Sequence, residues 1–274
     1  MVEKVVDHFN LEQICDSGQC FRMKKKSGNL YEVIAGDRYL AISQNGNRVS
    51  FDCTQEEYEE FWKRYFDLGT DYKKFIHRID CSDSYLIEAA RFGSGIRILR
   101  QDLWEMIVSF LISQQNNIQR IRRCIENLCE TYGEKKQNKA GYSYYAFPKP
   151  EALAGLGEDD LKECNLGYRS KYVVRTAKMA ADTEVDLQKI EQSTYPKAKE
   201  ELMKFYGVGS KVADCICLFA LHQMEAFPVD THISQALREH YPNGFPMEDY
   251  PGFQGILQQY IFYYELMGKK TKEQ

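Results

Sequence analysis

The 274-residue sequence lacks any apolar run long enough to cross a membrane; its longest extends only from Cys215 to Leu221. A membrane-spanning helix needs about 20 apolar residues, so we expect none. The opening segment MVEKVVDHFN contains acidic side chains and lacks the apolar core of a secretory signal. Proline is scarce, with seven residues beside 18 glycines, and 43% of the residues are hydrophobic. This composition excludes collagen-like, low-complexity and disordered chains.

An excess of positive charge is also missing, because 36 Lys and Arg residues face 40 Asp and Glu residues, for a net charge of −4. The basic footprint of a typical nucleic-acid-binding domain is therefore absent from the overall composition. A local basic face would still be sufficient to bind nucleic acid. The nine cysteines are odd in number and scattered along the chain, which indicates reduced thiols in a cytoplasmic protein rather than a disulfide framework.

The first third of the chain has the pattern of an antiparallel sheet. Residues 31–34, 39–42 and 49–51 are rich in β-branched and aromatic side chains, and Gly36-Asp37 and Asn45-Gly46 lie between them. An Asn-Gly pair between two such runs predicts a tight hairpin. Residues 54–66 then become helical, with Thr54 and Glu57 at capping-box spacing.

Helical spacing dominates from about residue 96. Apolar side chains recur at intervals of three and four residues over 104–111, 118–128 and 256–264, and another helix is predicted over 211–223. A polar segment, GEKKQNKAGYS at 133–143, interrupts the pattern and is expected to be a mobile loop. We therefore predict an α+β protein of two domains, an antiparallel β-rich domain over 1–95 packed on a larger all-α domain over 96–274.

One segment combines a tight turn with the start of a helix. In FYGVGSKVAD (205–214), Gly207 and Gly209 allow the backbone to turn sharply and to approach another molecule closely. The amide groups of the helix that starts at Ser210 would attract an anion such as phosphate. This pattern predicts a helix-hairpin-helix anion site. A nucleotide-binding P-loop is disfavoured, because its Gly-Lys-Ser/Thr order follows a strand, whereas Gly-Ser-Lys here follows a helix.

A lysine and a carboxylate in this region suit covalent chemistry on a sugar. Lys211 lies at the predicted helix start, where the helix dipole and desolvation favour a neutral amine that can form a Schiff base. Asp230 lies nineteen residues later, in FPVDTHI, between an extended stretch and a helix. It could serve only as a helix N-cap, or it could stabilise positive charge that develops on the sugar.

These two segments resemble the helix-hairpin-helix glycosylase superfamily, and more closely its 8-oxoguanine DNA glycosylases. Four other segments are similar to that branch in the same order along the chain: DSGQCFR (16–22), RILRQD (97–102) with QNNIQR (115–120), LGYRSKY (166–172) and GILQQYIF (255–262). The resemblance implies a DNA glycosylase and lyase, with Lys211 as nucleophile and Asp230 as its acidic partner. It also implies double-stranded DNA containing 8-oxoguanine as the partner of a monomer.

The resemblance assigns further roles residue by residue. Gly18 would offer its backbone carbonyl to the N7 hydrogen that distinguishes oxidised guanine from guanine. The remaining base-pocket residues would be Phe21, Cys215, Phe219, Gln258 and Phe262, with the base held between Cys215 and Phe262. Residues in contact with DNA would be Gln115, Asn116, Asn117, Arg120, Tyr168, Arg169, Gly207, Gly209 and His232. The first three would fill the gap left by the extruded base, while Arg120, Tyr168 and Arg169 would read the opposite cytosine.

The resemblance has departures and leaves two rival functions open. Tyr206 stands where the family usually has proline, Gln115 replaces an asparagine, and Phe219 stands where methionine is common. The backbone carbonyls of Met203, Phe205 and Val208 would hold a monovalent or similar cation. The C-terminus lacks the four-cysteine run of the iron–sulfur members, so we expect no cluster and no required cofactor. The rivals are a glycosylase for another damaged or mismatched base and a non-catalytic DNA-binding module.

Overall fold

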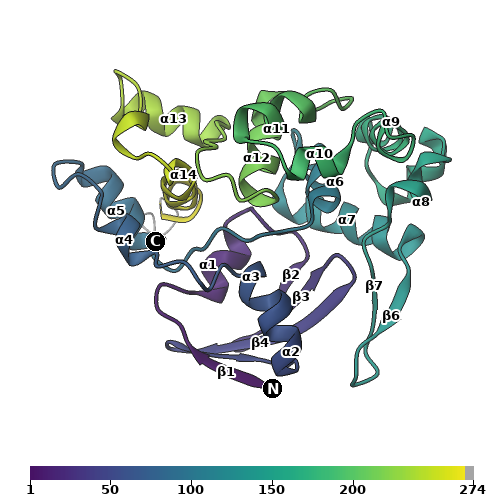
Figure 1. Cartoon of the computed structure of the whole chain (residues 1–274), viewed down its shortest axis with the longest axis horizontal. Coiled ribbons are helices and arrows are strands. Elements are labelled where there is room, and N and C mark those ends of the chain that lie inside the picture. Colours follow the sequence, from purple (N-terminus) through teal and green to yellow (C-terminus); the bar gives the residue numbers. More distant parts are fainter. Residues whose placement is uncertain (269–274) are drawn as a thin grey trace.

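The computed structural model describes residues 1–268 and begins with a five-stranded antiparallel sheet, in the order β1-β5-β4-β3-β2 (Figure 1). Its strands are β1 (Val2–Val5), β2 (Met23–Ser27), β3 (Leu30–Ala35), β4 (Arg38–Asn45) and β5 (Arg48–Phe51). The three strands predicted from the sequence are confirmed as β3, β4 and β5. The edge strand β1 was not anticipated, because its four residues show too short an alternation.

One face of the sheet is buried by short helices. The side chains of Val33, Leu40 and Phe51 have no exposed surface and belong to one hydrophobic core cluster. The covering side chains come from α1 (Leu11–Asp16), the π-helical turn η1 (Tyr58–Trp62) and α3 (Lys63–Tyr65). The preceding α2 (Gln55–Glu57) has no buried residue. The predicted capping box is confirmed, since Glu57 N donates to Thr54 Oγ1 and Thr54 N donates to Glu57 Oε2.

The rest of the chain is largely helical and surrounds a second, larger core. Its α-helices are α4 (Lys73–Ile76), α5 (Ser84–Phe92), α6 (Leu103–Ser113), α7 (Ile118–Tyr132), α8 (Pro150–Ala154), α9 (Arg169–Ala181), α10 (Leu187–Glu191), α11 (Tyr195–Leu202), α12 (Ser210–Phe219), α13 (Thr231–His240) and α14 (Gln254–Tyr263). Shorter turns are η2 (Glu158–Cys164), η3 (Met247–Asp249) and η4 (Tyr264–Gly268). Figure 1 shows these helices on one side of the sheet. The predicted α+β architecture is confirmed.

Two expectations about individual elements were wrong. The polar segment 133–143 is not a structureless loop, because β6 (Lys135–Gln137) and β7 (Ser143–Tyr145) pair as an antiparallel hairpin. Tyr144 of this hairpin packs on Tyr39 of β4, with ring centroids 5.4 Å apart. The helix predicted over 211–223 ends four residues earlier, at Phe219, and Gln223 N then donates to the carbonyl of Cys217.

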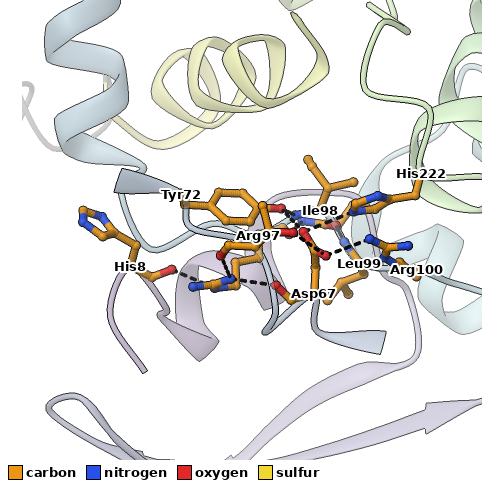
Figure 2. A network of polar contacts seen from close by, with 10 residues as sticks. His8, Asp67, Tyr72, Arg97, Ile98, Leu99, Arg100 and His222 are labelled. Carbon is orange, nitrogen blue, oxygen red and sulfur yellow. Dashed lines mark hydrogen bonds and ion pairs between the residues drawn. The ribbon is translucent and has the colours of Figure 1, made fainter. Parts of the chain in front are cut away.

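The passage between the two cores is fixed by buried polar contacts (Figure 2). Arg97 donates to the backbone carbonyls of Asp7 and His8, near the N-terminus, and of Asp67 and Thr70, after α3. The segment that leads into the helical part is thereby held against the sheet domain. The domain boundary at residues 95 and 96 stays a prediction. Helix α5, which precedes it, packs with α14 in the larger core.

Candidate active site

A tight hairpin joins α11 to α12. Gly207 adopts φ = +90°, and a Cβ at this position would lie 2.8 Å from the ring of Tyr172 on α9. Gln114 fixes the turn from another side, because its Nε2 donates to the Gly207 carbonyl at 3.1 Å. Gly209 is the N-cap of α12 and has open space where a side chain would project. The first amide groups of α12 can therefore be approached from outside, as an anion site requires.

Lys211 lies in the first turn of α12, between an aromatic ring and a thiol. Its Nζ is 5.8 Å from the ring centroid of Phe110 on α6, and its charge acts on the thiol of Cys215, one turn along α12. Burial raises the pKa of the Cys215 thiol to about 11, while the charge of Lys211 opposes this shift. Cys215 is therefore a neutral neighbour of the amine.

Asp230 caps α13, and its charge acts on the same thiol as the charge of Lys211. Its Oδ1 accepts a hydrogen bond from Ile233 N at 2.9 Å, so the expected N-cap is confirmed. The carboxylate remains 23% exposed, and its Oδ2 is 3.6 Å from His232 Nδ1. The charge of Asp230 also contributes to the raised pKa of Cys215, on which Lys211 acts with opposite sign. The cap therefore uses Oδ1, and Oδ2 faces His232.

Gly18 and Phe262, from opposite ends of the chain, are in contact. Gly18 adopts φ = +73°, and a Cβ there would lie 3.1 Å from Phe262 Cε1 and 3.9 Å from Ile118 Cδ1. The ring of Phe262 also meets His232 edge-on, with centroids 5.8 Å apart. The structure thus joins Gly18, Phe262, His232 and Asp230 in one series of contacts.

Gln258 is buried on α14, as expected of a base-pocket side chain, and its amide is already in use. Its Nε2 donates to the Pro228 carbonyl at 2.9 Å, and its Oε1 accepts from Gln259 Nε2 at 3.2 Å. Pro228 lies two residues before Asp230, so this contact links α14 to the carboxylate segment. The place of Gln258 in the base pocket stays a prediction.

The predicted gap-filling segment is the turn between α6 and α7. Gln115 is exposed and adopts φ = +48°, a left-handed conformation that is uncommon for a residue other than glycine. Asn116 Nδ2 donates to the Ile112 carbonyl, and Asn117 caps α7 by accepting from Arg120 N. Gln115 therefore projects from a turn whose two following side chains fix its backbone.

Arg120, Tyr168 and Arg169 lie around this turn in very different environments. Arg120 is exposed on α7, and Tyr168, at the start of α9, is 50% exposed. Arg169 is only 3% exposed, and its donors are occupied by the backbone carbonyls of Gln114, Gln115 and Leu166. Its guanidinium also stacks on the Tyr168 ring, 4.5 Å from the centroid. In this structure Arg169 supports the turn, and its predicted contact with an opposite base would require these carbonyls to be released.

Family comparisons agree with this geometry. Residues 1–107 match the model of the 8-oxoguanine DNA glycosylase N-terminal domain. Residues 108–245 match the model of the HhH-GPD superfamily of base excision DNA repair proteins, and this range contains the hairpin, Lys211 and Asp230. The chain belongs to the 8-oxoguanine DNA glycosylases of the HhH-GPD superfamily.

Relatives within this family align over most of the chain. A Saccharomyces cerevisiae protein named N-glycosylase/DNA lyase is 34% identical over 215 residues, which cover 74% of this chain and 55% of the yeast protein. The chain thus spans about half the length of that relative. The structure of MBOgg1 in complex with a low-affinity DNA ligand has a TM-score of 0.91 and 35% identity, covering 96% of this chain and 94% of that one.

A third relative was solved with a substrate-like duplex. The Clostridium acetobutylicum 8-oxoguanine glycosylase/lyase, in complex with double-stranded DNA containing cytosine opposite 8-oxoG, has a TM-score of 0.89 and 37% identity. The match covers 96% of this chain and 94% of that chain.

Within residues 1–268, no helix is both long and apolar enough to span a membrane.

Sequence reasoning missed Phe110, which lies beneath Lys211. Its ring meets Phe21 edge-on at 5.7 Å and stacks on Phe219 at 5.6 Å, so it joins two predicted pocket residues. Phe110 lies in α6, where ten consecutive residues, 103–112, are buried. Its apolar neighbours in the sequence are no different from those of a core residue, so only the position of Lys211 above its ring reveals its place in the site.

Proposed function

We propose that this protein removes 8-oxoguanine from double-stranded DNA and then cleaves the abasic strand by β-elimination. The observation that carries the proposal is the position of Lys211, at the open start of α12 and above the Phe110 ring. The charges of Lys211 and Asp230 also act, with opposite signs, on the pKa of the same thiol, that of Cys215. The Clostridium acetobutylicum relative named 8-oxoguanine glycosylase/lyase supports the choice of substrate.

In the proposed reaction, the neutral amine of Lys211 attacks C1′ of the damaged nucleotide, and the bond from C1′ to the base breaks. The base leaves with the bonding electrons and takes up a proton. Opening of the sugar ring then gives a Schiff base between Nζ and C1′. Loss of a C2′ proton expels the 3′ phosphate, which is the lyase step. Asp230, whose Oδ1 is held by Ile233 N, stabilises the positive charge that develops on the sugar.

Selection of the base is assigned to the contact between Gly18 and Phe262. The carbonyl of Gly18 would accept the N7 hydrogen of 8-oxoguanine, whereas the N7 lone pair of normal guanine would face this oxygen unfavourably. The base itself would lie between Phe262 and Cys215. An enzyme that acts on a base must first extrude it from the duplex, and the turn at Gln115 is the segment that would fill the gap.

Cytosine is the opposite base that we propose, read by Arg120 and Tyr168 together with Arg169. The duplex bound to the Clostridium acetobutylicum relative supports this assignment. The side chain of Arg120 is exposed, and the ring of Tyr168 is half-exposed, so both can be approached by DNA. A bidentate arginine contact is worth about 1–3 kcal/mol of discrimination between bases.

The remaining parts of the proposal concern a cation and the cellular setting. Carbonyl oxygens suit hard cations, and those of Met203, Phe205 and Val208 lie in the turn before α12. The carbonyl of Phe205 already accepts from Val208 N at 3.1 Å, and its second lone pair would face the ion. All nine cysteines are unpaired thiols, which supports the proposed cytoplasmic setting. The monomeric state and independence from other cofactors stay predictions.

Borohydride trapping tests the proposal. Wild-type protein mixed with a duplex containing 8-oxoguanine opposite cytosine should form a covalent adduct after reduction. Lys211→Gln should bind the same duplex but should release no base and form no adduct. Lys204→Gln, a change at an exposed lysine on the other side of the hairpin, is the control and should trap normally.

Two results would contradict the proposal. Trapping by Lys211→Gln at the wild-type level would remove the lysine from its role, and absence of any adduct with wild type would favour a non-catalytic DNA-binding module. Efficient release of a different damaged or mismatched base, with 8-oxoguanine left intact, would point to the other rival.

A further inference from the structure

Two cations and an aromatic ring form a cluster at the edge of the hairpin. Lys171 and Arg175 lie one turn apart on α9, and both face the ring of Tyr206. Lys171 Nζ is 5.4 Å and Arg175 Cζ 4.4 Å from the ring centroid. A hydrogen bond with Lys171 lowers the pKa of the Tyr206 phenol. Thr176 holds the backbone beneath, since its Oγ1 donates to the Tyr206 carbonyl at 3.2 Å.

Within residues 1–268, neither Lys171 nor Arg175 forms an ion pair with a carboxylate. Like charges four residues apart on a helix destabilise that helix. The face of the Tyr206 ring offsets part of this repulsion, and Glu158 contributes a negative charge only at longer range. An unpaired positive pair in a chain of net charge −4 is a surface suited to an external anion.

The cluster is continuous with the turn before α12, which we expect to bind a phosphate. Tyr206 immediately precedes Gly207, and Tyr172, the ring on which Gly207 packs, meets Tyr206 edge-on at 5.6 Å. The open start of α12 at Gly209 follows two residues later. The cations of α9 therefore flank the first residue of this turn, and the amide groups of α12 begin at its end.

We propose that Lys171, Arg175 and Tyr206 form a second phosphate site, which holds the DNA strand bound by the hairpin at a neighbouring phosphate. This inference rests on the proposed function. The ring of Tyr206 keeps the two cations in place, and the cations contact the backbone of the strand without reading its bases. Such contacts fix the position of a duplex but carry no sequence information. Tyr206 stands where the family usually has proline, and in this proposal its ring positions the two cations.

The salt dependence of DNA binding tests this site. The probe is a duplex with an uncleavable tetrahydrofuran abasic analogue, titrated at roughly 50–200 mM KCl, where phosphate contacts dominate the slope of log K against log salt. Each lost contact reduces that slope by about 0.9. Lys171→Ala/Arg175→Ala should therefore lower it by about 1–2 relative to wild type. Lys171→Arg/Arg175→Lys, which keeps both charges, should retain the wild-type slope, and so should Tyr206→Phe, which keeps the ring.

A matched control removes one lysine and one arginine elsewhere. Arg48→Ala/Lys73→Ala changes exposed residues of β5 and α4 and should leave the slope at the wild-type value. An unchanged slope for Lys171→Ala/Arg175→Ala would overturn the proposal. An equal decrease in the control would also overturn it, because the effect would then come from net charge alone.

A second measurement separates this inference from the proposed function. Single-turnover release of 8-oxoguanine at saturating enzyme should be the same for wild type and Lys171→Ala/Arg175→Ala, because neither cation touches the reacting atoms. Normal release combined with an unchanged salt slope would reject the phosphate site and leave the glycosylase intact. Absence of release by wild type would reject the proposed function itself.

Discussion

The ring of Phe262 lies directly against the backbone of Gly18, so close that a Cβ on Gly18 would be 3.1 Å from Cε1 of the ring. These residues come from the turn after α1 and from α14, which are separated by almost the whole chain. Gly18 also has φ = +73°, a conformation that side chains rarely adopt. A side chain at this position would therefore have a strained backbone and would have to displace the ring of Phe262.

Gly18→Ala should impair recognition of the oxidised base. The added methyl group would displace Phe262 or move the Gly18 carbonyl, which we assign to the N7 hydrogen of 8-oxoguanine. Excision should fall roughly ten- to a hundredfold, the effect of about 1–3 kcal/mol for a misplaced buried acceptor. Gly28→Ala is the control, since Gly28 has φ = +53° but no atom within 4 Å of the added Cβ. Single-turnover kinetics that fall equally in both variants would argue against a specific role for Gly18.

Asp230→Asn should slow excision while the protein stays folded. The cap to Ile233 N survives, because asparagine caps a helix about as well as aspartate. The negative charge beside the sugar is lost, and we expect a decrease of roughly a hundredfold or more, as for removal of other transition-state stabilisers. Excision rates and thermal melting should be measured together. A lower melting temperature with unchanged excision would make Asp230 purely structural.

Arg120→Ala and Arg169→Ala should separate base reading from support of the turn. Arg169 is buried on the carbonyls of Gln114 and Gln115, so its loss should cost about 2 kcal/mol of unfolding free energy. Arg120 is exposed, and its loss should change stability by less than about 0.5 kcal/mol.

Excision opposite each of the four bases completes that comparison. Wild type should prefer cytosine by roughly ten- to a hundredfold, and Arg120→Ala should lose most of this preference. Urea denaturation supplies the stability values. Equal wild-type rates on all four duplexes would exclude reading of the opposite base, and a preference that survives both substitutions would assign the reading to other residues.

Glu105 should make stability fall as the pH rises toward and past neutrality. Burial raises the pKa of this carboxyl to about 7, although Arg22 partly opposes the shift. The folded protein therefore holds a proton that the unfolded chain has already lost, and its stabilising effect disappears between about pH 4.5 and pH 7. Glu105→Gln still accepts from Gly36 N and should lack this dependence, a difference of at most about 3 kcal/mol. The melting temperatures of wild type and Glu105→Gln should be measured from pH 5 to pH 8. An equal change with pH in the two proteins would contradict this expectation.

The elements best predicted from the sequence are those with local signals. Asn45-Gly46 and the alternation around it indicated the β4–β5 hairpin, and Thr54 with Glu57 indicated a helix start. The hairpin over 135–145 was missed because its strands are only three residues long, and its packing on Tyr39 depends on distant residues.

Within the site, residue types were predicted more readily than their environments. The sequence indicated Lys211 and the cap at Asp230 from their places beside helix starts. It could not reveal that Arg169 is buried beneath three carbonyls, because those carbonyls belong to Gln114 and Gln115 on one segment and Leu166 on another. The same holds for Phe110, whose contact with Lys211 arises only from packing of α6 against α12.

The contacts of Arg97 limit how this protein can be divided or rebuilt. One guanidinium holds carbonyls that belong to the first residues of the chain and to the segment after α3, while its own backbone leads into the helical part (Figure 2). A transplant of the helical part alone would leave Arg97 without any of these acceptors. In the sheet domain alone, the same carbonyls would lose their donor. The two parts are therefore not exchangeable modules, and a chimera with another glycosylase must carry residues 7–8, 67–70 and 97 together.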